Sequence, residues 1–257
     1  MDSQQRIAVL IDAENVSSKY IKLILDEVSD YGIATYKRLY GNFEIPSVKA
    51  WMDKIQEYAL TPVFQCNYTQ GKNASDSALI IDAMDILYSE NVTAFCIVTS
   101  DSDFTKLAMR LRESGMTVIG MGEQKTPSSL VSACETFKFL DILYKEDKPA
   151  PSQPKREVTY VAEESLVPAA RVSTSIPTRR EIEKEIIAII EARAGDEEWV
   201  DLSEIGDNLP KRVPGFDPRN YKCQKLKQLI ETFKSLETKS IQNPHNKILK
   251  IVYVKVR

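Results

Sequence analysis

The sequence predicts an α/β protein in two parts: a parallel sheet covered by helices on both faces, followed by a small α+β domain. Three observations predict this fold. Apolar runs alternate with segments of helical periodicity over the first 145 residues, a proline-rich stretch interrupts the alternation, and an amphipathic helix and two alternating apolar segments follow. At roughly 100–200 residues per domain, a chain of 257 residues is expected to hold two modest domains.

Five apolar runs of the first part are expected to be strands, at residues 7–11, 34–40, 62–65, 94–99 and 118–121. Helical periodicity fills the gaps between them, at residues 17–29, 46–59, 75–89 and 103–114. The repeated strand–helix–strand order implies a parallel sheet with both faces covered. In such sheets the ligand crevice lies beyond the carboxyl ends of the strands, so the residues that follow each strand are the first candidates for a site.

The middle of the chain changes in character. Residues 146–177 contain five prolines among scattered Ser, Thr, Lys and Glu, which is the composition of a flexible linker. This linker is expected to separate a domain over residues 1–145 from a second domain over residues 178–257.

The net charge of −3 is an average of two unlike parts. Residues 1–145 contain 14 basic and 19 acidic side chains, whereas residues 211–257 contain 12 basic and 3 acidic ones. A basic cluster of this kind indicates polyanion binding, although a solvated lysine-rich surface has the same composition.

Several chemistries are excluded by the single histidine, His245. A paired-histidine nuclease and an H-E-x-x-H zinc peptidase each need two, and no nucleophile-elbow sequence accompanies His245 for a Ser–His–Asp triad. The four cysteines show no C-x-x-C spacing, which favours a reducing compartment. No signal peptide and no apolar run of about 20 residues is visible, so a cytoplasmic protein without a membrane partner is expected.

Carboxylates follow two of the predicted strands. Asp12 comes directly after the first strand, and Asp101 follows the fourth strand after Thr99-Ser100. If these strands are neighbours, the two carboxylates converge at one edge of the sheet. Asp76 lies at the start of the helix over residues 75–89, in line with the face that the helix buries.

Carboxylates gathered in a crevice repel one another unless a cation neutralises them. Oxygen ligands without His or Cys suit Mg²⁺ or Mn²⁺, which clamp phosphate oxygens and activate water. Each residue also has a structural alternative: Asp76 can favour the helix N-terminus, Asp101 can cap the next helix, and Asp12 can open a turn. The placement of all three at one predicted edge favours a site.

Five neighbouring residues are candidates for supporting roles, each with a structural alternative. Asn15 can orient water or a ligand carboxylate, or cap a helix. Ser100 can reach a metal-bound water or satisfy its loop, and Asp103 can be a further carboxylate of the site or a cap. Asp82 falls on the flank of its helix, and Lys72 can grip phosphate or be a solvated loop lysine.

Four segments resemble the motifs of one family. They are Ile11-Asp12-Ala13-Glu14-Asn15, Tyr40-Gly41, Lys72-Asn73-Ala74-Ser75-Asp76 with Asp82 downstream, and Thr99-Ser100-Asp101-Ser102-Asp103-Phe104. Over about residues 5–142 the chain resembles the NYN domains, a branch of the PIN-like nucleases, and within them the LabA-like bacterial group. The resemblance implies a Rossmann-like PIN fold and a divalent-metal ribonuclease site. Carried over by position, Asp12, Asp76 and Asp101 would be metal ligands, and Asn15 and Asp103 would be supporting residues of the site.

The second domain has the order of a winged helix, three helices and a terminal hairpin. Its spacing W-V-x-L-S-x-I…F-x-P-x-x-Y, over residues 199–205 and 216–221, resembles the OST-HTH/LOTUS domain, a family associated with RNA binding. The third helix is expected to carry four basic residues suited to phosphate contacts: Arg219, Lys222, Lys225 and Lys227. Lys222 and Lys225 are three apart and would share a helix face.

These expectations combine into a divalent-metal-dependent ribonuclease that hydrolyses phosphodiester bonds of single-stranded or structured RNA, held by the winged helix. The rival is a non-catalytic RNA-binding adaptor with a metal-binding acidic pocket. A phosphatase acting on small molecules is disfavoured, because a small substrate needs no second basic domain. A homodimer and a protein partner of the LOTUS-like domain stay open.

Overall fold

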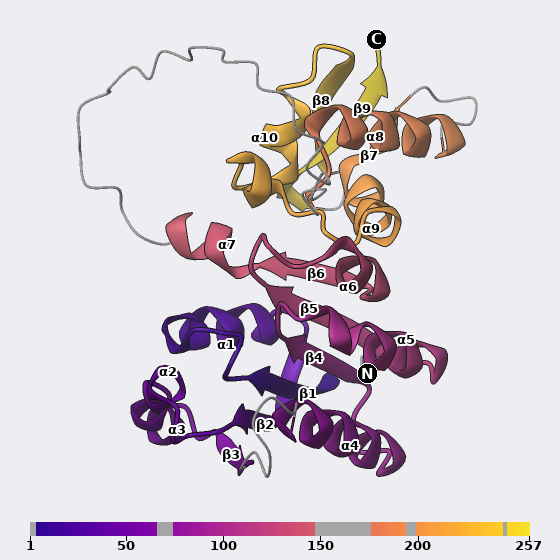
Figure 1. The fold of residues 1–257 in the computed structure, drawn as a ribbon. Helices are drawn as coiled ribbons and strands as arrows, with labels where there is room; N and C mark the ends of the chain where they lie inside the picture. Colours follow the sequence, from indigo (N-terminus) through magenta and orange to yellow (C-terminus); the bar gives the residue numbers. More distant parts are fainter. Residues whose placement is uncertain (1–3, 66–73, 147–175, 194–198, 244–245) are drawn as a thin grey trace, which may run out of the picture.

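The structure is a computed structural model, which describes residues 4–65, 74–146, 176–193, 199–243 and 246–257. It contains a larger α/β domain and a smaller α+β domain (Figure 1). Within this part of the chain, no helix combines the length and the apolarity that a membrane span requires.

The α/β domain is built on one six-stranded sheet whose paired strands are all parallel. The strand order is β3-β2-β1-β4-β5-β6. The strands are β1 (Gln5–Asp12), β2 (Gly32–Gly41), β3 (Thr61–Phe64), β4 (Ala94–Val98), β5 (Thr117–Gly122) and β6 (Thr136–Phe139). The five predicted strands are confirmed. The sixth, β6, was not predicted because its four residues include a lysine and form no continuous apolar run.

Helices cover both faces of this sheet. The helical segments are η1 (Ser18–Tyr20), α1 (Ile21–Ser29), α2 (Pro46–Lys49), α3 (Met52–Glu57), α4 (Ala74–Tyr88), η2 (Ser102–Phe104), α5 (Thr105–Glu113), α6 (Ser128–Ala133) and α7 (Leu140–Glu146). The alternation of β1 explains the two layers: Ile7, Val9 and Ile11 pack against α1, α2 and α7, whereas Ala8 and Leu10 join the core with α4, α5 and α6. The central strands are therefore apolar throughout.

The register of the central strands brings the candidate residues together. β1 pairs with β4, with Ile11 beside Val98, and pairs on its other side with β2, with Asp12 beside Tyr40. The strand order thus reverses at β1, which is where ligands bind in open parallel sheets.

A close approach between β5 and the end of β4 requires glycine at position 122. A Cβ atom on Gly122 would lie 2.5 Å from the Thr99 carbonyl oxygen and 3.0 Å from the Ser100 Oγ. Any larger residue would displace the segment that leads into Asp101.

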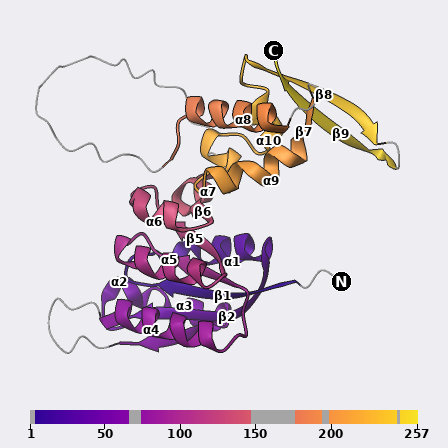
Figure 2. The same ribbon diagram turned by 90° about the vertical axis from the view of Figure 1, so that its right-hand side faces the viewer.

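The smaller domain contains the first two predicted helices and the predicted hairpin (Figure 2). Its elements are α8 (Arg179–Arg193), β7 (Val200–Asp201), α9 (Leu202–Arg212), η3 (Pro218–Tyr221), α10 (Leu226–Ile230), β8 (Leu236–Asn243) and β9 (Asn246–Val256), with sheet order β7-β9-β8. Ile186, Leu209, Tyr221, Leu229 and Val254 meet in a separate buried core. The two-residue strand β7 was not predicted.

The expected third helix is wrong, because the chain forms two short helices instead of one. Asp217 caps η3 by accepting a hydrogen bond from the Arg219 amide, and Lys222 then adopts a left-handed conformation with φ of 62°. A left-handed residue ends a right-handed helix. Lys222 and Lys225 therefore do not share a helix face.

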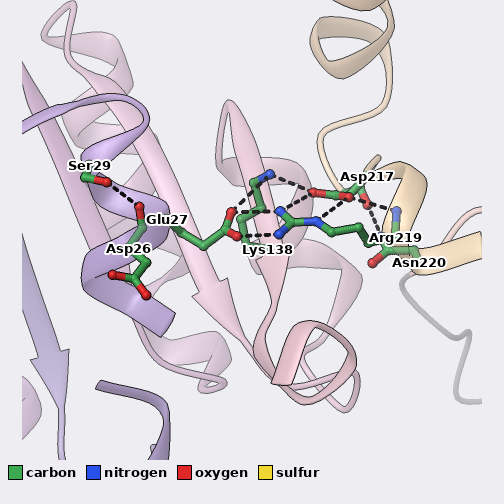
Figure 3. Close-up of polar contacts among 8 residues, drawn as sticks. Asp26, Glu27, Ser29, Lys138, Asp217, Arg219 and Asn220 are labelled. Atoms are coloured by element: carbon green, nitrogen blue, oxygen red, sulfur yellow. Dashed lines mark hydrogen bonds and ion pairs between the residues drawn. The ribbon is translucent and has the colours of Figure 1, made fainter. Parts of the chain in front are cut away.

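Four charged residues join the two domains (Figure 3). Arg219 donates to both carboxylate oxygens of Glu27 in α1, over 2.6 and 2.9 Å. Lys138 in β6 lies 2.7 Å from Asp217 and 3.4 Å from Glu27. Arg219 also contacts Asp217, so each carboxylate meets two cations.

This cluster is largely out of water, since the Glu27 and Asp217 side chains are each only 6% exposed. Burial alone would raise the pKa of Asp217, but the hydrogen bonds and charges of Arg219 and Lys138 outweigh it and hold the pKa at about 2. The Phe137 amide also donates to the Pro214 carbonyl over 2.6 Å, so the smaller domain covers the edge strand β6.

The substitution Arg219→Ala is expected to lower the free energy of unfolding by about 2–4 kcal/mol, because it leaves Glu27 and Asp217 buried with only Lys138. Chemical denaturation measures this.

The control is Arg212→Ala, which removes an exposed 3.5 Å pair with Glu185 and should cost less than about 0.5 kcal/mol. The Arg219 contribution should be fully present above about pH 4 and fade as the pH falls toward 2, as Asp217 protonates. Equal losses in the two variants would contradict the account.

Candidate metal centre

Three carboxylates converge at the carboxyl edge of the sheet. Oxygen atoms of Asp76, Asp101 and Asp103 all lie within 4.8 Å of one another. Asp76 comes from the first turn of α4, whereas Asp101 and Asp103 come from the segment between β4 and α5. Among the described residues, this is the group of acidic, histidine or cysteine side chains whose spacing suits a metal ion.

Asp12 lies beside this group at the end of β1 but is not one of the three. Its side chain is 2% exposed and accepts four hydrogen bonds. The donors are the Glu14 and Asn15 amides, the Asn15 Nδ2 and the Thr99 Oγ1. A carboxylate has about four lone-pair positions, so these donors engage all of them. Burial raises the pKa of Asp12, and the hydrogen bonds offset part of that rise.

Thr99 connects the ends of the two central strands. Its hydroxyl donates to Asp12 Oδ2 over 2.8 Å and accepts from the Asp101 amide over 3.1 Å. The β1–β4 pairing therefore fixes the position of Asp101 relative to Asp12. Sequence reasoning missed Thr99 as a site residue, although a polar residue that ends an apolar strand just before Ser100-Asp101 was a usable signal.

The negative charges at this edge act on Asp76. Burial is the largest cause that raises the pKa of Asp76, to about 6, and the charges of Asp12, Asp101, Glu14 and Asp103 add to it. Glu14 was not predicted as a site residue, and its side chain accepts a hydrogen bond from the Asn42 amide. Burial and the neighbouring carboxylates thus disfavour the charged form of Asp76.

The structural alternatives and the site are compatible. Asp101 caps η2 by accepting from the Asp103 amide over 2.9 Å, and Asp12 organises the turn that follows β1. The Asn15 Nδ2 donates to Asp12 over 2.7 Å, so Asn15 orients a carboxylate. Ser100 satisfies its loop by accepting from the Glu123 amide.

Asp82 contacts strand β2 and not the acidic group. Its carboxylate forms an ion pair with Arg38 and accepts a hydrogen bond from the Tyr40 hydroxyl, both on β2. It therefore anchors α4 to the sheet, and this contact positions Asp76, which lies six residues earlier in the same helix. Lys72 lies outside the described residues.

The donor set fits a hard divalent cation. All three side chains offer oxygen, no histidine or cysteine of the described residues joins them, and a cation would offset the neighbouring charges that help to raise the pKa of Asp76. Mg²⁺ and Mn²⁺ both prefer such ligands.

A parallel α/β domain with carboxylates at its strand ends has the architecture of the PIN-like nucleases. The NYN domain model matches residues 6–142, and the OST-HTH/LOTUS domain model matches residues 179–248. The chain belongs to the NYN family, which is a PIN-like nuclease family, and it carries an OST-HTH/LOTUS domain of the kind associated with RNA binding.

The names of the three similar proteins described below state no activity. An uncharacterised protein of Methanocaldococcus jannaschii is 27% identical over 125 residues, and the match spans 47% of this chain and 49% of that one. A crystal structure of a Vibrio parahaemolyticus protein of unknown function aligns with TM-score 0.46 and 17% identity, over 54% of this chain and 94% of its own. A solution structure of residues 175–257 of a Chromobacterium violaceum protein aligns with TM-score 0.25 and 29% identity, over 29% of this chain and 79% of its own.

The substitution Asp76→Asn is expected to stabilise the metal-free protein at pH 8. The pKa of Asp76 is about 6 in the folded chain against 3.8 as its usual value, so ionised Asp76 opposes folding above pH 6. Discounted for solvent screening, the gain in the free energy of unfolding is about 1 kcal/mol, and it should shrink as the pH falls from 6 toward 4. Denaturation in chelator measures this gain.

The control is Asp85→Asn, on the exposed face of the same helix, which should change the free energy of unfolding little. Identical behaviour of the two variants would refute the claim that ionised Asp76 opposes folding.

Proposed function

We propose that this protein is a divalent-metal-dependent ribonuclease that hydrolyses RNA phosphodiester bonds. The observation that carries the proposal is the group Asp76, Asp101 and Asp103 at the edge of an NYN sheet. Its connection to an OST-HTH/LOTUS domain supports RNA as the polyanion. On the sequence motif Ser100-Asp101-Ser102-Asp103-Phe104 we also assign it to the LabA-like group.

In this proposal Asp76, Asp101 and Asp103 hold Mg²⁺ or Mn²⁺. A divalent cation at this position supplies polarisation of the phosphate and a lower pKa for the attacking water. Asp12, expected from the sequence to be a ligand, has its lone pairs engaged by four donors, so it contributes charge and position instead. Thr99 and Asn15 hold Asp12 in place, and Thr99 also holds the Asp101 backbone.

The decisive experiment incubates labelled RNA with the full chain and Mn²⁺. Asp101→Asn is expected to lower the cleavage rate by roughly 10²-fold or more, because it removes a charged ligand oxygen. The matched control Asp85→Asn should cleave like the unaltered protein. RNA binding without cleavage in the unaltered protein would contradict the ribonuclease and favour the adaptor.

The affinity of the site for Mn²⁺ should also depend on pH. Because the pKa of Asp76 is raised to about 6, protons compete with the cation for this carboxylate below that pH. The apparent Mn²⁺ affinity is therefore expected to fall as the pH is lowered from 7 to 5, and Mn²⁺ titrations at each pH measure it. An affinity that is constant over this range would contradict the role of Asp76 as a ligand.

We propose that RNA phosphates contact Lys222 and Lys225, which are exposed on the smaller domain. Lys227 is a weaker candidate because it lies 3.7 Å from Glu231. Arg219 is left out of this surface, because its guanidinium is occupied by Glu27 and Asp217.

The double charge reversal Lys222→Glu/Lys225→Glu should weaken RNA binding roughly tenfold at low salt and less at high salt. A filter-binding titration measures this. Lys22→Glu/Lys184→Glu, an equal change of charge at exposed positions of α1 and α8, is the control. Equal weakening by both pairs would show a general charge effect and not a defined surface.

A further inference from the structure

Two phenylalanines lie at the carboxyl ends of strands β2 and β3, at the same edge of the sheet as the carboxylates. Phe64 is the last residue of β3, the edge strand, and is 48% exposed. Phe43 follows β2 and packs partly against the core. Their ring centroids are 6.2 Å apart, with 32° between the ring planes. Phe43 thus supports one side of Phe64 while nearly half of Phe64 faces solvent.

A short series of contacts connects this aromatic pair to the acidic group. Asp12 pairs with Tyr40 across β1 and β2, and Gly41 pairs with Phe64 across β2 and β3. The Asn42 amide, next to Phe43, donates to Glu14 over 3.0 Å. Glu14 is one of the charges that act on Asp76, so the aromatic pair and the carboxylates lie along the same carboxyl edge of the sheet, with the aromatic pair toward β3.

Among the described residues one other aromatic side chain is exposed, and its position differs from that of Phe64. Tyr88, 70% exposed, lies at the C-terminal end of α4, the opposite end of the helix from Asp76. Contact with water raises the free energy of a half-exposed phenylalanine, and a flat apolar partner that covers the ring removes that cost.

We propose that Phe43 and Phe64 form a stacking platform for an unpaired base of the substrate whose phosphate is held at the carboxylates, at the same edge of the sheet. The inference rests on the proposed ribonuclease function and narrows its substrate to single-stranded RNA. Bases of single strands can be splayed onto aromatic rings, whereas bases in a duplex are already stacked on their neighbours. The platform accepts any base, because every base presents a flat π face.

The test uses the full chain and a short single-stranded RNA that contains 2-aminopurine, whose fluorescence is quenched by stacking. Binding is measured with Ca²⁺ in place of Mn²⁺, so that a divalent cation is present at the carboxylates and the readout is binding, not cleavage. Phe64→Leu, which keeps an apolar side chain but removes the ring, is expected to weaken binding about tenfold and to reduce the quenching. Phe64→Tyr, which keeps an aromatic ring, should retain the binding and the quenching of the unaltered protein.

The matched control is Ile33→Ala. Ile33 is 52% exposed near the start of β2, at the opposite edge of the sheet, and its loss should leave binding and quenching unchanged. Unaltered binding and quenching in Phe64→Leu would overturn the platform, as would equal weakening for a duplex of the same sequence. If the unaltered protein shows Phe64-dependent stacking but no cleavage with Mn²⁺, the ribonuclease proposal fails and the platform stands.

Discussion

The pairing of β1 with β4 is the constraint on which the candidate site depends. It places Asp12 beside the segment that contains Thr99 and Asp101, and the Thr99 hydroxyl fixes the two strand ends to each other. α4 then brings Asp76 to the same edge, held there by the contacts of Asp82 with β2. A one-residue shift of this pairing would turn the Asp12 side chain to the other face of the sheet, away from Thr99, since neighbouring strand residues point to opposite faces.

The two domains differ in the charges that they contribute. The α/β domain concentrates carboxylates in which burial and like charge raise the pKa of Asp76, an arrangement that favours a cation. The smaller domain supplies basic residues, and one of them, Arg219, is used to join the domains. Four charges in balance at that contact keep the smaller domain against β6 and leave Lys222 and Lys225 exposed.

The sequence predicted what depends on periodicity and missed what depends on long-range contact. Long apolar runs and strand-end carboxylates identified five strands and the acidic edge. β6 was too short and too polar to be recognised, and its stability comes from β5 and from the backbone bond of Phe137 to Pro214. Helical spacing gave the wrong geometry for Lys222, because a single left-handed residue depends on local backbone conformation. The ion pair between Arg219 and Glu27 joins residues 192 positions apart, so no local sequence pattern predicted it.

The same reason applies to Asp12. Its position after β1 predicts a ligand, whereas its four hydrogen bonds are a property of the folded site, and on that ground we propose Asp103 in its place. The most direct measurement is an anomalous difference map from a crystal soaked in Mn²⁺. The account predicts a peak between the carboxylates of Asp76, Asp101 and Asp103; a well-ordered site without a peak there would contradict it.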